Sequence, residues 1–145
     1  MSSITLPQES KPILLGNDSA AVDTKQRFFV KDTIRNGKNL SGIEFAVLYD
    51  EQLKLVIYQY LDVVYSNIKR FEKIRDSLHE PERSAAEKEL QKLFTIIKTR
   101  YTVDKSGRIV LFDEIYDALI EKKVYLQGRS DSFAVAAEPN ILLQR

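Results

Sequence analysis

The stretch from Ser41 to Leu78 constrains the fold most, because it holds the longest uninterrupted pattern of apolar residues at helical spacing. Ser41 and Glu44 have the spacing of a capping box, which marks the start of a helix. At about 100° per residue, most apolar side chains of this stretch share one arc roughly 160° wide. They are Ile43, Phe45, Ala46, Tyr49, Leu53, Val56, Ile57, Tyr60, Leu61, Val63, Val64, Ile68, Phe71, Ile74 and Leu78. We expect one helix over residues 41–78, with an apolar face wider than one neighbouring helix can cover.

Four other side chains of this helix need a separate explanation. Leu48 and Leu55 lie one heptad apart and point away from the apolar arc, so they are either singly exposed leucines or residues that an arm or a partner covers. Tyr58 and Tyr65 lie at the margin of the arc, where they either stack on bases or sit across the boundary of the core.

The segment after Leu78 predicts a second helix, a small hairpin and a third helix. Pro81 suits a first helical position, and an apolar stripe at helical spacing continues to Tyr101. The short link makes this helix an antiparallel partner of the long one. Two short apolar runs around residues 104–107 predict a β-hairpin near residues 102–111, and Asp113 is the N-cap of a third helix.

The two ends of the chain look different from the middle. Residues 1–40 contain short apolar patches, Phe28 and Phe29 among them, that are separated by Pro, Gly and Asn turn signals. Residues 127–145 are similarly punctuated. We therefore expect a mainly α fold divided into an extended N-terminal arm at 1–40, a helical domain at 41–126 and a C-terminal arm at 127–145.

The composition limits the functional classes. The 145 residues suit one domain. Cysteine is absent, which removes disulfides and thiolate chemistry. There are 22 basic and 21 acidic residues, so the net charge of +1 neither requires nor excludes nucleic acid. No apolar segment is long enough to span a bilayer. We expect a soluble, cytoplasmic protein.

Catalytic and metal-binding patterns are weak. The sole histidine, His79, lies at a helix junction, and no phosphate loop or nucleophile motif is present. Residues from Asp104 to Asp113 partly match a calcium loop, but a hairpin turn at Gly107 explains them equally. A resemblance between residues 47–51 and 110–114 is too short to indicate a repeat. We expect neither an enzyme nor a cofactor.

These patterns favour a non-catalytic structural or adaptor subunit of a larger protein assembly. We expect it to bind other protein subunits or form an oligomer through its arms and its apolar helix face, and not to bind a membrane. Its candidate partner-binding residues are Leu48, Leu55, Tyr58, Tyr65, Phe28 and Phe29. The alternative is a small regulatory protein that binds nucleic acid through basic helix ends. The residues for that alternative are Lys69, Arg70, Lys73, Arg75, Lys98, Arg100 and Arg108.

Overall fold

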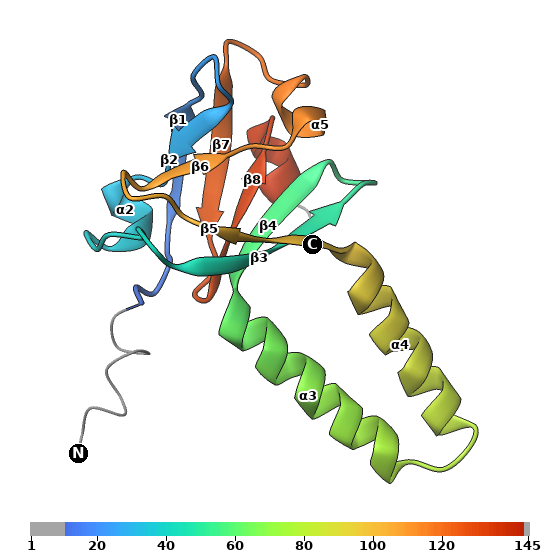
Figure 1. Cartoon of the computed structure of the whole chain (residues 1–145). Helices are drawn as coiled ribbons and strands as arrows, with labels where there is room; N and C mark the ends of the chain where they lie inside the picture. The colour runs from blue at the N-terminus through green and yellow to red at the C-terminus, as the bar shows by residue number, and fades with distance from the viewer. Residues whose placement is uncertain (1–10, 144–145) are drawn as a thin grey trace, which may run out of the picture.

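The computed structural model describes residues 11–143, which form an antiparallel β body and a projecting pair of helices (Figure 1). The strands are β1 (Asn17–Ala21), β2 (Arg27–Phe29), β3 (Glu44–Asp50), β4 (Leu55–Tyr60), β5 (Ile97–Thr102), β6 (Arg108–Val110), β7 (Lys123–Gly128) and β8 (Ser132–Ala136). The helices are α2 (Asp32–Arg35), α3 (Leu61–Ser77), α4 (Glu82–Ile96), α5 (Asp113–Tyr116) and the 3-10 helix η2 (Pro139–Leu143). Six strands make one sheet in the order β1-β7-β8-β4-β3-β5, while β2 and β6 make a separate two-stranded ribbon.

The predicted mainly α fold is wrong, and so is the single helix over residues 41–78. This stretch forms β3, a turn, β4 and then α3. Residues 45–49 of β3 are all buried, because one face of the strand meets the main core and the other meets the base of the helices. Burial on both faces removes the alternation that identifies a strand, so a near-continuous apolar run satisfied a helical period by coincidence.

The predicted arms are also wrong as descriptions of the fold. In the N-terminal segment β1 pairs with β7, and in the C-terminal segment β8 pairs with both β4 and β7 near the centre of the sheet. The parts of the predicted arms at residues 1–10 and 144–145 lie outside the described residues.

The remaining elements were predicted in part. The hairpin near 102–111 is wrong because β5 pairs with β3 and β6 with β2, although Gly107 does adopt the positive φ of a turn, at +83°. The third helix is only the short α5, and β7 follows it. The second helix is confirmed as α4, an antiparallel neighbour of α3, but residues 97–101 belong to β5. One helical pair on a β body is not a helical bundle.

The β body is built from two equivalent halves. Exchanging β1–β4 with β5–β8 leaves the strand order unchanged when it is read from the opposite edge. The register obeys the same exchange: Phe28 faces its counterpart Ile109 in the ribbon, and Ile57 faces its counterpart Ala134 in the sheet. A pseudo-two-fold axis therefore passes through the β2–β6 and β4–β8 pairs.

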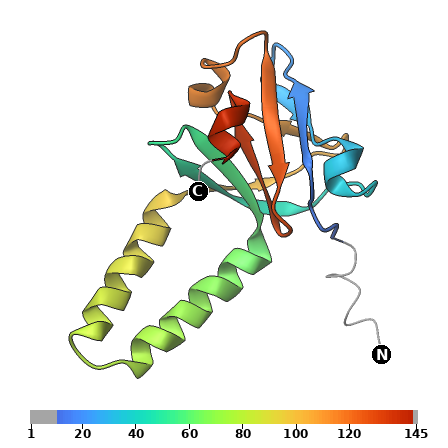
Figure 2. The same ribbon diagram turned by 180° about the vertical axis from the view of Figure 1, so that it is seen from behind.

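The two halves are intertwined. The first strand of each half pairs with the third strand of the other, as β1 with β7 and β5 with β3. The main core lies between the sheet and the ribbon, where Phe45, Tyr58 and Phe133 pack together. Helices α3 and α4 connect the halves and extend away from the body, with their loop at the far end (Figures 1 and 2).

Candidate functional site

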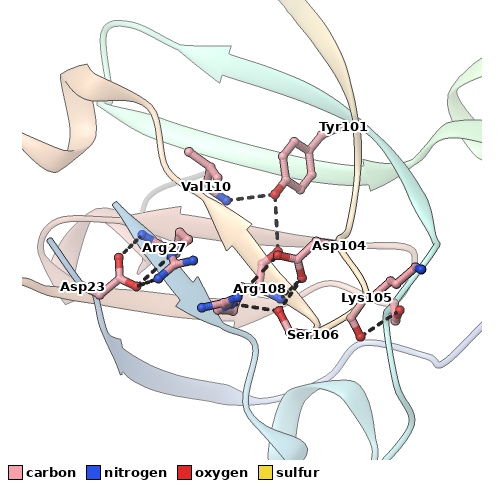
Figure 3. Close-up of polar contacts among 9 residues, drawn as sticks. Asp23, Arg27, Tyr101, Asp104, Lys105, Ser106, Arg108 and Val110 are labelled. Carbon is pink, nitrogen blue, oxygen red and sulfur yellow. Dashed lines mark hydrogen bonds and ion pairs between the residues drawn. The ribbon is translucent and has the colours of Figure 1, made fainter. Parts of the chain in front are cut away.

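The ribbon carries the same turn twice, once in each half of the chain. Asp23 precedes β2 and Arg27 begins it, while Asp104 precedes β6 and Arg108 begins it. The turns bend at Gln26 and Gly107, with φ of +65° and +83°. In each turn the amide of the bending residue donates to the aspartate carbonyl at 3.0 Å. The chain thus builds two Asp–Arg turns related by the pseudo-two-fold axis (Figure 3).

The side chains of the two turns make related contacts. The backbone amide of Arg27 donates to Asp23 Oδ1 at 2.9 Å, and that of Arg108 donates to Asp104 Oδ1 at 2.9 Å. Arg27 Nε also donates to Asp23 Oδ2 at 2.9 Å. Arg108 Nε donates instead to the Ser106 hydroxyl at 2.8 Å, and that hydroxyl donates to Asp104 Oδ1 at 2.8 Å. Both guanidinium groups are therefore oriented by their own turn.

The carboxylates of Asp23 and Asp104 stabilise the turns by accepting backbone hydrogen bonds. The backbone amide of Arg27 lowers the pKa of the Asp23 carboxyl, and the backbone amide of Arg108 does the same for Asp104. Hydrogen bonds to a carboxylate favour its charged form. Both groups are therefore ionised at neutral pH, and their acceptor oxygens are engaged within the turn.

The outer face of the ribbon is part cationic and part apolar. In the register Arg27 lies opposite Val110 and Phe29 lies opposite Arg108, while Phe28 and Ile109 point into the core. Phe29 is 52% exposed and Val110 is 45% exposed. The two arginines occupy diagonal positions, for which Cα atoms are about 8 Å apart.

Two tyrosines support the ribbon from the body. The Tyr101 hydroxyl accepts from the Val110 amide at 3.1 Å and donates to the Arg108 carbonyl at 3.3 Å (Figure 3). The Tyr58 hydroxyl donates to the Val110 carbonyl at 3.2 Å. Burial raises the pKa of Tyr58 far above its usual value, so this hydroxyl keeps its proton. The position of β6 is thus fixed by the tyrosines of β4 and β5 as well as by its pairing with β2.

Two lysines add charge at the turns. Lys25 and Lys105 are exposed, and neither ammonium group forms an ion pair within residues 11–143. With Arg27 and Arg108 they supply four cations, against three carboxylates: those of Asp23 and Asp104, and that of Asp113, which accepts from Gln26 Nε2 at 2.8 Å. The ribbon end of the body therefore has a local excess of positive charge, although the whole chain is nearly neutral.

The sequence-predicted partner residues are divided between core and surface. Leu48 is buried with Leu61 and Val64 at the base of α3, and Leu55 is buried beside Leu142 of η2. Their own chain covers them. Tyr58 and Phe28 are fully buried and meet edge to face at 6.4 Å. Of this set, Phe29 on the ribbon and Tyr65 on α3 are exposed.

The basic residues predicted for nucleic acid do not form one surface. Lys69, Arg70 and Lys73 are exposed on α3, and Arg75 is bound to Asp76 and Glu87. Arg100 lies on β5 beside Tyr65 and Glu44. The side chain of Lys98 lies outside what the structure describes. Of these predicted basic residues, Arg108 is the one that lies on the ribbon.

Sequence reasoning missed the repeat that creates the site. Over residues 22–34, a shift of 81 residues aligns five identities: Val22 with Val103, Asp23 with Asp104, Arg27 with Arg108, Asp32 with Asp113, and Ile34 with Ile115. The resemblance between residues 47–51 and 110–114 has another origin, since the first lies at the end of β3 and the second joins β6 to α5.

Within residues 11–143 no three His, Cys, Asp or Glu side chains are grouped to hold a metal ion. No helix of the described chain is long and apolar enough to cross a membrane. A comparison with known proteins found no matching family model and no matching curated protein.

Proposed function

We propose that this chain is a non-enzymatic DNA-binding protein that contacts a duplex with the β2–β6 ribbon. The proposal rests on one observation: the two Asp–Arg turns present Arg27 and Arg108 on the same outer face, related by the pseudo-two-fold axis. It keeps the nucleic-acid alternative drawn from the sequence but moves it from the basic helix ends to the ribbon.

Shape and chemistry favour double-stranded DNA. A two-stranded ribbon is narrow enough to enter the major groove of B-DNA, and arginine is the side chain that most often contacts guanine there. The two-fold relation between the arginines matches the local two-fold symmetry of a duplex. The major groove of double-stranded RNA is too narrow for the same approach. Lys25 and Lys105, which flank the ribbon, would lie near phosphates.

The test compares two charge-matched variants by fluorescence anisotropy with a labelled duplex of random sequence. Lys25→Ala with Lys105→Ala removes the free cations of the turns, whereas Lys69→Ala with Lys73→Ala removes two from α3. We expect wild-type affinity to fall roughly tenfold between about 50 mM and 200 mM salt if the two lysines each contact a phosphate. The turn variant should lower the salt slope by about 2, and the α3 variant should behave as wild type.

Two results would contradict the proposal. One is the absence of duplex binding at the lower salt concentration. The other is a loss of binding in the α3 variant and not in the turn variant, which would return the interface to the helices. Circular dichroism of each variant verifies that its fold is intact.

A structural or adaptor subunit is the second candidate. Its original basis, a wide apolar face on one long helix, is lost because residues 44–60 form β3, a turn and β4 of the β body instead of a helix. A different observation favours it: the distal half of the α3–α4 pair has exposed apolar side chains, among them Phe71, Ile74 and Ile96. Such a surface is typical of a protein interface.

A further inference from the structure

A groove lined mainly by apolar side chains lies between α3 and α4, outside the β body. It has a volume of about 590 Å³ and is lined by Phe71 and Ile74 of α3 and by Ala86, Leu90, Leu93 and Ile96 of α4. Phe71, Ile74 and Ile96 are 42%, 47% and 41% exposed. An antiparallel helix pair with one open apolar side resembles half of a four-helix bundle.

The groove is open because the helices leave the sheet. At their base Leu61 and Val64 are buried against β3. Farther out, Arg75 of α3 binds Glu87 of α4 at 2.7 Å and joins the helices. Between these points Leu90 is the buried residue of α4, and no element of the described chain covers the other side of the pair.

The outer stripe of α4 identifies the occupant. Ala85, Glu89, Lys92 and Ile96 are exposed and follow one another at spacings of four, three and four residues, which is the spacing of a coiled-coil seam. Glu89 and Lys92 also line the groove and form an exposed ion pair at 3.4 Å. Read along the helix, the stripe is small, acidic, basic and large.

This stripe is complementary to itself in the antiparallel direction. A two-fold axis between residues 90 and 91 places Glu89 opposite Lys92 of a second copy, and Lys92 opposite Glu89 of that copy. The same axis places the large Ile96 opposite the small Ala85. Such a self-complementary patch is the property that an isologous dimer interface requires.

We propose that two copies of this chain associate through their helical pairs, with α4 antiparallel to α4 along the stripe Ala85, Glu89, Lys92 and Ile96. The two open grooves face each other in a four-helix bundle that covers Phe71 and Ile74. This interface specifies the partner for the structural-subunit candidate. It is separate from the ribbon and is tested without nucleic acid.

The experiment is a charge swap on the full chain, with the mass measured by light scattering after size exclusion over a range of concentrations. Wild type should run as a dimer of the 16.7 kDa chain. Glu89→Lys alone and Lys92→Glu alone each put like charges opposite each other, and should weaken the dimer about tenfold or more, which is about 1.4 kcal/mol. The double variant Glu89→Lys with Lys92→Glu restores both pairs and should restore the dimer.

Lys73→Glu is the matched control, because Lys73 is exposed on α3 outside the groove lining. It should leave the dimer unchanged. A wild-type monomer at every concentration would overturn the proposal. An oligomer that ignores both single swaps, or that the double swap does not restore, would also overturn it. All the substituted side chains are exposed, so the variants should fold, and urea unfolding checks this.

Discussion

The β body and the α3–α4 pair use apolar residues in opposite ways. In the body, Phe45, Tyr58 and Phe133 are fully buried between elements from both halves. In the distal part of the helical pair, Phe71 and Ile74 remain substantially exposed. The apolar excess that the sequence suggests for partner binding is therefore mostly consumed by the duplicated body. The part of the excess that remains exposed is concentrated on the helices that join its halves.

The strongest way to break this comparison is to separate the halves at the helical loop. Fragments 11–79 and 80–143 should each be unfolded as monomers, because β1 would lack β7 and β5 would lack β3. Mixed together, they should regain the sheet. Far-UV circular dichroism and amide NMR spectra of each fragment and of the mixture measure this. A fragment that folds alone as a monomer would show that the halves are independent.

A smaller effect separates the two regions by single substitutions. Phe133→Ala should lower the free energy of unfolding by about 3–5 kcal/mol, because the side chain is buried and stacks on Tyr58 at 4.9 Å. Phe71→Ala should cost less than about 1 kcal/mol in the monomer, since the side chain is 42% exposed. Urea unfolding at low protein concentration measures both. Equal losses would mean that the helical pair has a core of its own.

The smallest effect sharpens the equivalence of the two turns. Gly107→Ala should cost about 1 kcal/mol, because φ is +83° there. The nearest atom to an added Cβ is Asn39 Oδ1 at 3.7 Å, an ordinary contact, so the cost comes from the backbone. Gly107→Asn is the control and should cost less, since asparagine tolerates this conformation. Thermal unfolding compares the variants, and equal costs for Ala and Asn would place the effect elsewhere.

The sequence predicted α4 because one face of that helix is exposed to solvent and polar. Leu90 is buried and Leu93 is partly buried, whereas Glu89 and Lys92 are exposed to solvent, so the apolar residues of α4 keep the helical period. The strands β3 and β4 have no solvent-exposed face of comparable length. The chain also passes from Tyr60 of β4 to Leu61 of α3 without a glycine or proline, so nothing in the pattern marks the change.

The candidate site was hidden for two further reasons. Asp23 and Arg27 are four residues apart, which is also the spacing of a helical ion pair, so the motif alone does not indicate a turn. The matching turn lies 81 residues away, with the helical pair inserted between the two halves. The five shared identities are scattered over thirteen positions, and their meaning depends on strand pairing that brings β2 beside β6.

The α3–α4 pair breaks the pseudo-two-fold symmetry of the β body, because it follows β4 and has no counterpart after β8 within the described residues. By the exchange that relates the halves, η2 (Pro139–Leu143) lies where the first turn of α3 lies, and within the described residues no second helix like α4 follows it. A body rotated by half a turn about its axis would look the same at the ribbon, yet its helices would point the other way. A fluorophore on the loop between α3 and α4 therefore reports the orientation of the protein on an elongated ligand, that is, which half of the body lies nearer to which end of the ligand.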